Sequence, residues 1–404
     1  MNKSPLTKNE IIKLFNKQKK LISSIENVDL KYSNDRILAE DLKSLIDLPP
    51  FNNSAVDGYA IIRKDLNSKK IFTCTRRIAA GDNKKIIIKT GEAVRVFTGA
   101  KMPLNSSTVV MQENVLIKGK TVKLLKTPKF GDNYRLKGED IKKGRKILSK
   151  GTRINQQNLN LIAAAGIRKI KVYKKIKIGF FTSGNELRKP TYKLKNAEIN
   201  NSNYYALYTL LDKNYIRKKY VGNLKDNLQS VKNNLKSASK KFNIIITAGG
   251  ASVGDEDHLI NALSSLGKIY FWRAAIKPGR PLAFGKINKC LVFCLPGNPV
   301  SVQLLYAMLI KPLIIKLSGG TLELPTSNKI QVSFDMKKKT KRMEWLRVIK
   351  TSKNNRDLAS KYPKQGSGMI SSVSYSNGII EIGEDVSLIK KGDIFEFFDF
   401  NSLF

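Results

Sequence analysis

Apolar residues recur at helical spacing in three segments of the chain's first half. Residues 9–15 and 36–42 each carry apolar side chains three and four positions apart, which predicts two helices. The same spacing over residues 159–165 predicts a third helix, which ends at Gly166. An alternating run at 170–173 then predicts a strand.

Two other regions have the alternating pattern of half-buried β-strands. Short runs separated by turn residues predict strands at 86–88, 93–97, 108–111, 121–125, 330–334, 344–349 and 394–398. We expect the first four strands to form an all-β domain and the last three a small β-barrel.

Strands and helices alternate between residues 176 and 320, which is typical of βαβ units with a parallel sheet. The run 244–247 is apolar and β-branched, so it is expected to be the buried central strand. Further strands are predicted at 176–181 and 291–294, and helices at 203–211, 259–266 and 302–310, with Ser301 as the N-cap of the last.

Together these patterns predict an α/β plus β protein of several domains. The expected domains are a helical one (1–47 plus 149–175), an inserted β domain (48–148), an α/β domain (176–320) and a C-terminal β-barrel (321–404).

Polar loops follow three predicted strands of the α/β domain, at 182–186, 249–257 and 295–301. Ligands of open α/β sheets lie outside the carboxyl ends of the strands, so these loops are expected to converge on one crevice. Glycine lets backbone N–H groups approach a phosphate, and the acids at 255–257 can hold a hard divalent cation. For Gly249 and Gly250 taken alone, a strand followed by an ordinary polar turn is the alternative interpretation.

Two further segments carry candidate chemistry. Lys277 and Arg280 flank a Pro-Gly pair that stiffens their backbone, which suits a fixed anion clamp.

In the loop 295–301, Asn298 can hydrogen-bond a ring edge of a ligand or hold the loop closed. Asp57 precedes Gly58 in a loop that presents a single carboxylate, although an Asp-Gly turn before a strand explains the same residues.

The charge of the chain is strongly positive. Lys and Arg number 74 against 32 Asp and Glu, which gives a formal net charge of +42. This excess raises nucleic acid, anionic membranes and anionic small molecules as partners. The lysines are spread along the chain without an aromatic RNA-binding signature. We therefore expect small anions and no nucleic acid; compositional drift remains an alternative explanation of the charge.

The cysteine and histidine content excludes several classes of site. Cys74, Cys290 and Cys294 are odd in number and predict no disulfide framework. Cys290 and Cys294 share one face of a predicted strand and are expected to be buried. His258 is the single histidine, which excludes most His-based metal sites. The N-terminus has no apolar signal segment, and the stretch 300–315 is interrupted and too short to cross a bilayer, so we expect a cytoplasmic protein without a membrane partner.

Eight motifs in this order resemble the molybdopterin molybdenumtransferase family, which is related to the E domain of gephyrin. They lie at 49–60, 98–100, 138–140, 183–187, 249–257, 277–281, 295–301 and 365–368. The resemblance covers nearly the whole chain. It implies an elongated homodimer with a three-layer molybdopterin-binding α/β domain. The active cleft would lie between the α/β domain of one subunit and the β domain of the other.

The resemblance also implies a reaction and its site residues. Molybdenum from molybdate would enter adenylylated molybdopterin with Mg²⁺ present, AMP would leave, and a separate molybdopterin adenylyltransferase would be a partner. The catalytic residues implied are Asp57, Thr98, Asp140, Glu186, Asp226 and Asp257, of which Glu186 and Asp257 would hold the metal. The substrate-binding residues implied are Gly249, Gly250, Ser252, Gly254, Lys277, Arg280, Pro296, Gly297, Asn298, Pro299 and Ser301.

The chain departs from the family pattern at several positions. Where the family often has an acidic residue, this chain has Asn52, Asn201, Lys225 and Asn243, and where the family commonly has a lysine it has Arg280. The exchange at Asn201 could weaken metal binding. Three alternatives stay open: a molybdopterin adenylyltransferase, a non-catalytic gephyrin-like scaffold and a nucleic-acid binder. The residues do not distinguish molybdate from tungstate, nor do they indicate how stably the adenylyltransferase docks.

Overall fold

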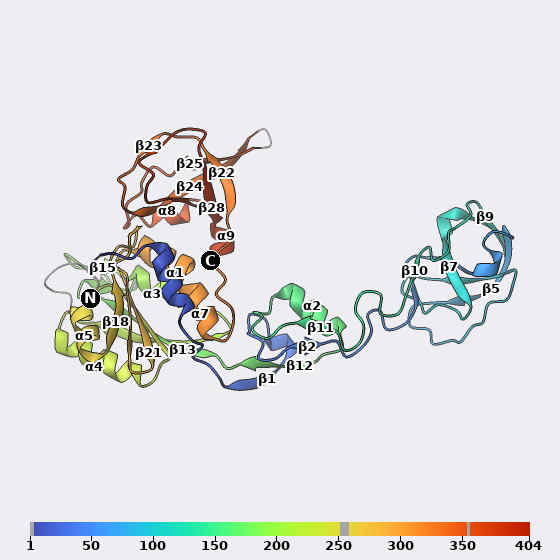
Figure 1. Ribbon diagram of the computed structural model, residues 1–404, viewed down its shortest axis with the longest axis horizontal. Helices are drawn as coiled ribbons and strands as arrows, with labels where there is room; N and C mark the ends of the chain where they lie inside the picture. The colour runs from blue at the N-terminus through green and yellow to red at the C-terminus, as the bar shows by residue number, and fades with distance from the viewer. Residues whose placement is uncertain (1–3, 251–257, 354–355) are drawn as a thin grey trace.

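The computed structural model describes residues 4–250, 258–353 and 356–404, which form an elongated molecule (Figure 1). The α/β domain and the C-terminal barrel lie at one end, and the β domain lies at the other. A smaller part, built of paired strands and one helix, connects the two ends (Figure 1).

A six-stranded sheet forms the core of the α/β domain. Its elements are β13 (Ile176–Ser183), α3 (Ser202–Leu210), β16 (Ile216–Leu224), α4 (Leu228–Ser239), β17 (Ile244–Ala248), α5 (His258–Leu266), β18 (Lys268–Trp272), β20 (Ala283–Ile287) and β21 (Cys290–Leu295), with a small pair β14 (Leu187–Arg188) and β15 (Ile199–Asn200). The order is β16-β13-β17-β21-β20-β18, and the first four strands are parallel. The strands predicted at 176–181, 244–247 and 291–294 are confirmed, as are the helices at 203–211 and 259–266.

Hydrophobic clusters lie on both faces of this sheet. Ile244 and Ile246 of β17 pack in one cluster with Phe15 of α1 (Lys8–Asn16), whereas Ile245 packs in another with Leu235 of α4. Because both faces are buried, the strand shows a continuous apolar run instead of alternation. The predicted helix at 9–15 is confirmed, and it packs against the α/β domain.

A buried helical segment follows β21. It comprises α6 (Pro299–Leu305), a π-helical turn η4 (Tyr306–Ile310) and α7 (Lys311–Leu317). The expectation that the stretch 300–315 is too short to cross a bilayer is wrong, because the 19 residues of the helix could do so by length and composition, but 83% of the apolar window is buried inside the protein. The segment is therefore a core helix of the α/β domain.

The predicted bounds of this helix are wrong. It begins at Pro299 with Asn298 as the N-cap, so Ser301 is a buried residue of the first turn and not the cap. Proline suits the first helical position because its fixed φ is helical and its missing N–H would have no partner there. Pro312 does not end the helix because it lies in the first turn after the π-helical turn.

The connecting part contains β1 (Ile25–Asp29), η1 (Leu30–Tyr32), β2 (Leu42–Lys43), β11 (Lys146–Leu148), α2 (Gln156–Ala164) and β12 (Lys169–Tyr173). Strand β1 pairs with β12, and β2 with β11. The helix predicted at 159–165 and the strand at 170–173 are confirmed.

The helix predicted at 36–42 is wrong. Leu38 N donates to the Thr152 carbonyl and Ala39 N to the Lys171 carbonyl, both at 3.0 Å. Ile37, Leu38 and Ala39 are all buried, and three consecutive residues cannot share one helix face. An extended segment between two neighbours buries them on both sides.

The β domain has a six-stranded sheet in the order β7-β4-β6-β5-β9-β8. Its elements are β3 (Asn53–Ser54), β4 (Gly58–Ile62), η2 (Arg63–Asp65), β5 (Ile71–Ile78), β6 (Glu92–Val96), β7 (Ser106–Met111), η3 (Gln112–Asn114), β8 (Val115–Lys118), β9 (Thr121–Leu124) and β10 (Tyr134–Arg135). The strands predicted at 93–97, 108–111 and 121–125 are confirmed. The strand predicted at 86–88 is wrong: Ile87 is exposed and forms only an isolated bridge with Leu104.

The C-terminal region is a closed β-barrel, as predicted. Its elements are β22 (Asn328–Val332), β23 (Met336–Lys337), β24 (Met343–Lys353), β25 (Arg356–Lys361), α8 (Ser371–Ser374), β26 (Gly378–Ile382), β27 (Leu388–Ile389), β28 (Ile394–Asp399) and α9 (Phe400–Leu403). Strand β26 pairs back to β24 and closes the ring β24-β25-β22-β28-β26. Strand β19 (Ile276–Lys277) of the α/β domain adds to β24 and joins the two domains.

Candidate functional site

Three loops meet at the carboxyl ends of the adjacent strands β13, β17 and β21. Gly249 N donates to the Leu295 carbonyl at 3.1 Å. Gly249 has φ +99°, and a Cβ there would lie 2.5 Å from the Ser183 carbonyl oxygen. A Cβ at Gly297 would lie 3.6 Å from the Gly249 Cα. A side chain at Gly249 would clash with the Ser183 carbonyl, so glycine at this position allows the loops after β13 and β17 to approach closely, whereas a Cβ at Gly297 would make only an ordinary contact.

Two carboxylates belong to this edge of the sheet. A Cβ at Gly184 would lie 2.5 Å from both carboxylate oxygens of Glu186, so this carboxylate lies directly over the Gly184 backbone. Asp226 follows the end of β16, whose last residue pairs with Ser183. Both Glu186 and Asp226 are exposed.

Three predicted site residues, Ser252, Gly254 and Asp257, lie outside the described residues. Within the described ranges there is no group of three or more His, Cys, Asp or Glu side chains placed to hold a metal ion. Among the residues that the structure describes, Glu186 and Asp226 supply the carboxylates at this edge of the sheet.

A network of neutral side chains supports the Gly184 loop. Asn201 Nδ2 donates to Thr182 Oγ1 at 2.9 Å, and Thr182 Oγ1 donates to Asn223 Oδ1 at 3.0 Å. Asn223 Nδ2 donates to the Gly184 carbonyl at 2.7 Å. Since Thr182 has one hydroxyl proton, Tyr220 must be the donor in the 3.0 Å pair of these two hydroxyls. Thr182 opens the predicted polar loop 182–186, whereas the sequence did not point to Tyr220 or Asn223, which carry no motif.

The amide of Asn203 supports the loop after β21. Its Nδ2 donates to the Gly297 carbonyl at 2.6 Å, while its Oδ1 is buried without a hydrogen-bond partner among the described residues. Of the predicted residues in this loop, Pro296 is buried, Pro299 is half-buried, and Gly297 and Asn298 are exposed. The loop therefore presents Gly297 and Asn298 outward from a fixed base.

The loop 365–368 of the barrel closes over the same segment. Asn298 Nδ2 donates to Ser367 Oγ at 2.8 Å, and Val300 N donates to the Ser367 carbonyl at 3.3 Å. The C-terminal domain thus contributes one wall at the start of α6.

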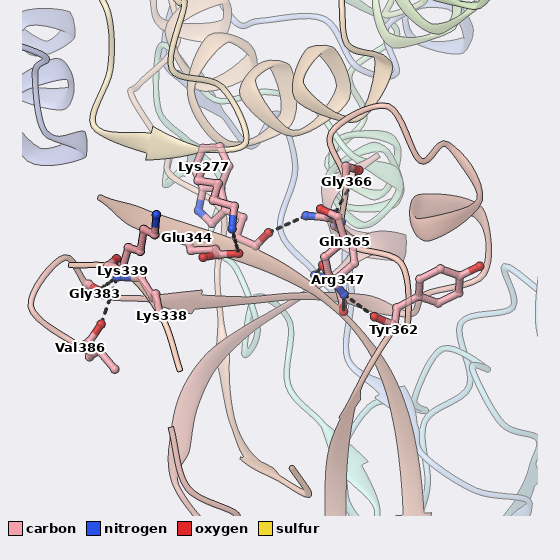
Figure 2. Close-up of polar contacts among 11 residues, drawn as sticks. Lys277, Lys338, Lys339, Glu344, Arg347, Tyr362, Gln365, Gly366, Gly383 and Val386 are labelled. Carbon is pink, nitrogen blue, oxygen red and sulfur yellow. Dashed lines mark hydrogen bonds and ion pairs between the residues drawn. The ribbon is translucent and has the colours of Figure 1, made fainter. Parts of the chain in front are cut away.

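The buried side chain of Arg347 holds this barrel loop in place (Figure 2). Its guanidinium donates to the carbonyls of Gln365 and Trp345, the latter at 3.1 Å, and to Ser372 Oγ at 3.2 Å. Burial lowers the pKa of Arg347 to about 10, and nearby Glu344 opposes this shift. The sequence did not indicate Arg347, because it sits inside an alternating strand without a motif.

Lys277 and Arg280, the predicted anion clamp, are both exposed. Lys277 Nζ lies 3.0 Å from Glu344 Oε1, and Glu344 is almost fully buried (Figure 2). A neighbouring cavity of about 210 Å³ is lined by Lys277, Glu344, Met336, Lys337, Lys338, Lys339 and Arg342. Lys277 is therefore paired with a carboxylate, and its role as an anion clamp stays a prediction.

Asp57 and Thr98 are brought together in the β domain. Asp57 Oδ1 accepts hydrogen bonds from Thr98 N and Thr98 Oγ1, both at 2.8 Å. These two bonds, the backbone one first, lower the pKa of Asp57. Asp140 is exposed in a loop, and its own backbone N–H donates to the Leu48 carbonyl at 3.0 Å.

A single chain does not bring all predicted catalytic residues together among the residues that the structure describes. The β domain that carries Asp57 and Thr98 lies at the opposite end of the molecule from the α/β domain that carries Glu186 and Asp226, and Asp140 lies between β10 and β11 in the connection that leaves the β domain (Figure 1). The structure therefore divides the predicted site into two groups.

Three family models match successive parts of the chain. Residues 6–166 match the "MoeA N-terminal region (domain I and II)", residues 179–316 the "Probable molybdopterin binding domain", and residues 329–400 the "MoeA C-terminal region (domain IV)".

Two relatives of similar length and one longer relative share about a third of the matched residues with the chain. The molybdopterin molybdenumtransferase of Haemophilus influenzae is 32% identical over 94% of this chain and 94% of that protein. That of Staphylococcus epidermidis is 30% identical over 97% of this chain and 95% of that protein. Gephyrin of Dictyostelium discoideum is 32% identical over 74% of this chain and 47% of that protein.

A solved structure has the same overall fold. The molybdopterin biosynthesis moeA protein of Pyrococcus horikoshii superimposes with a TM-score of 0.83 and 29% identity, covering 98% of this chain and 100% of that chain. The chain therefore belongs to the molybdopterin molybdenumtransferase family, whose members take part in molybdenum cofactor biosynthesis.

Proposed function

We propose that the chain inserts molybdenum from molybdate into adenylylated molybdopterin and releases AMP. The observation that carries this proposal is the convergence of three glycine-containing loops at one sheet edge, beside the exposed carboxylates of Glu186 and Asp226. A ligand with a pyrophosphate needs close backbone approach, and a reaction at phosphorus needs carboxylates that hold a cation.

In this proposal each loop would bind a different part of the substrate. The backbone at Gly249 and Gly250, with Ser252 and Gly254, would receive the phosphates in the three-layer domain that we infer. Pro296, Gly297, Asn298, Pro299 and Ser301 would shape the pterin pocket. The exposed cations Lys277 and Arg280 would attract the molybdate dianion.

The described acids fit Mg²⁺. This ion commonly binds through one or two carboxylates and substrate phosphates and keeps several waters. Glu186 and Asp226 are exposed at one edge and form no ion pair with another described residue. Glu186, together with Asp257, would hold the ion, and Asp226 would take part in the phosphate-cleavage step. When bound, Mg²⁺ would neutralise charge on the phosphate oxygens.

We further propose a homodimer in which the second subunit completes the site. Asp57 precedes β4 and Thr98 follows β6, so both belong to the β domain at the far end of the molecule (Figure 1), and Asp140 lies between β10 and β11, where the chain leaves that domain. They can act with Glu186 only if the β domain of a second copy supplies them. The Asp57 carboxylate, which Thr98 keeps ionised, would then line the cleft opposite the phosphates.

We place this activity in the cytoplasm, with a separate molybdopterin adenylyltransferase as the supplier of the adenylylated substrate. An adenylyltransferase role for this chain itself would use the α/β domain and leave the Asp57–Thr98 pair without a function. A non-catalytic scaffold role would leave the exposed carboxylates of Glu186 and Asp226 without a function.

Single-turnover release of AMP tests the proposal. Purified protein is mixed with adenylylated molybdopterin, molybdate and Mg²⁺, and AMP is followed by chromatography. We expect release by wild type and a loss of at least about a hundredfold for Glu186→Gln. The matched control is Glu323→Gln, because Glu323 is an exposed acid between α7 and β22 whose carboxylate accepts a hydrogen bond from Thr321, away from the loop edge. Substrate binding without AMP release by wild type would contradict the proposal.

A further inference from the structure

A second hollow lies at the opposite end of the central sheet from the proposed catalytic edge. Its volume is about 720 Å³, and it lies where β13, β16, β17 and β21 begin. Strand β17 has five residues, so the two ends of the sheet are separated by roughly 16 Å of strand. The hollow is therefore distinct from the site described above.

Positive side chains dominate its lining. Seven of the sixteen lining residues are Lys or Arg, against 74 of 404 in the whole chain. They are Lys174, Lys175, Lys177, Arg217, Lys240, Lys241 and Lys289, and all seven are exposed. We call the cavity lined by these seven cations the basic hollow. They come from four separate parts of the chain, so a local run of lysines does not explain the cluster.

The basic hollow has no carboxylate available to balance it. Its single acid, Glu26, is already paired with the buried guanidinium of Arg36. None of the seven cations forms an ion pair with an acid in the described part of the chain, although lysines elsewhere do, such as Lys218 with Asp212 at 2.8 Å. Burial first, and repulsion from Arg36 second, lower the pKa of Lys175.

Two neutral amides, Asn243 of the lining and Asn214 outside it, contact lysines of the hollow without adding charge. Asn243 accepts a hydrogen bond from Lys177 N at 2.9 Å, and Lys175 Nζ donates to Asn214 Oδ1 at 2.8 Å. A concave surface with one sign of charge focuses the field and concentrates counter-ions. Bound anions would remove the mutual repulsion of the seven cations.

We propose that the basic hollow binds a linear polyphosphate, either inorganic or the phosphate chain of a nucleoside triphosphate. A single dianion such as molybdate would balance two of the seven charges, whereas a triphosphate carries several negative charges along one chain. The volume lies in the range of small-molecule sites, roughly 300–1,000 Å³. Lysine ammonium groups bind phosphate oxygens as point charges and need no fixed bidentate geometry.

Isothermal titration with inorganic tripolyphosphate and with ATP tests this proposal. At an ionic strength of about 0.15 M we expect saturable binding of one molecule per chain. The variant Lys240→Glu/Lys241→Glu/Lys289→Glu should weaken it at least about tenfold, because three attractions become repulsions. These three side chains make no hydrogen bond among the described residues, so the variant should fold.

The matched control is Lys118→Glu/Lys120→Glu/Lys123→Glu, which removes the same charge from the exposed β8–β9 hairpin. It should change affinity less than about twofold, since it lies far outside a Debye length from the hollow. Equal affinity for both ligands would show that the phosphate chain is recognised, and tighter ATP binding would assign a nucleoside triphosphate.

Three results would overturn the proposal. They are the absence of saturable binding, an equal loss in both triple variants, and ATP binding that the first triple variant leaves unchanged. Tight binding of an oligonucleotide of about twenty nucleotides that tripolyphosphate cannot displace would instead assign the hollow to nucleic acid.

Discussion

Asn298 and Ser367 join two domains at the rim of the candidate site. The Asn298 Nδ2 group at the start of α6 donates to Ser367 Oγ of the barrel loop at 2.8 Å. The barrel loop is in turn held by the buried guanidinium of Arg347. The position of the α/β loop therefore depends on packing inside the C-terminal barrel.

Replacing Ser367 by alanine should weaken substrate binding with little effect on folding. The backbone bond from Val300 N to the Ser367 carbonyl remains, so only the bond to Asn298 is lost. We expect the dissociation constant for adenylylated molybdopterin to rise about 2- to 12-fold, as for a loss of about 0.5–1.5 kcal/mol. Equilibrium binding measures this. Ser68→Ala removes a comparable exposed bond in the β domain, and an equal effect there would contradict the prediction.

Two buried threonines on adjacent strands should respond in opposite ways to valine. Thr182→Val leaves Asn201 Nδ2 and Asn223 Oδ1 without their partner, which should lower the free energy of unfolding by about 1–3 kcal/mol. Thr247→Val should be neutral within about 0.5 kcal/mol or stabilising, because Thr247 Oγ1 is buried without a partner among the described residues. Urea denaturation followed by circular dichroism compares them. Equal destabilisation would show that the Thr182 network has no energetic role.

The stability of the protein should rise with pH because of Lys311. Burial first, with repulsion from Lys213 and Arg153, lowers the pKa of Lys311 to about 8, and Asp35 opposes this shift. In the unfolded chain the pKa returns to its ordinary value of 10.5. Between these values the unfolded state binds more protons, so this residue's contribution becomes more favourable as pH rises. Below about pH 8 both states are protonated and the penalty for the buried charge is fully present.

Lys311→Met should remove that dependence. Relative to the variant, wild type should gain stability between pH 7.5 and pH 10, as measured by urea denaturation at each pH. Lys17→Met, at an exposed lysine of the helix end, serves as the control. An identical pH slope for wild type and Lys311→Met would rule out this contribution.

The three thiols should differ in reactivity. Burial raises the pKa of the Cys290 thiol to about 12, and Cys294 is buried on the same strand, whereas Cys74 is half-buried. Iodoacetamide at pH 8 should therefore alkylate Cys74 in the native protein and reach the other two only after unfolding. Mass spectrometry of digested protein locates the label. Rapid labelling of native Cys74→Ser protein at Cys290 would contradict the burial of β21.

Local pattern was sufficient for β13, β17 and β21 but missed the edge strands β16 and β18 and the interior strand β20 of the same sheet. Strands β17 and β21 are continuous apolar runs and were predicted correctly. Strand β16 was missed because it is an edge strand of the sheet, where alternate residues such as Arg217 and Lys219 point away from the core. Helix α4 was also missed, since it buries only three of its residues.

The candidate site was predictable where motifs follow strands and unpredictable where long-range contacts make it. Glu186, Gly249 and Asn298 lie after strands, so their common edge follows from the topology of a parallel sheet. Arg347 acts through carbonyls of the loop 365–366, and nothing local marks that pairing. The error at 36–42 has the same origin, because two distant segments supply the backbone partners of that stretch.

The central claim is that one active site combines the β domain of one subunit with the α/β domain of another. The most direct measurement uses heterodimers of Asp57→Asn and Glu186→Gln, isolated with two different affinity tags and assayed for single-turnover AMP release. Each variant alone should be inactive. If the site is shared, the heterodimer contains one intact site of two and should recover about half of the wild-type activity. If each subunit forms its own site, no intact site exists and AMP release should stay at the level of the single variants, which would contradict the account.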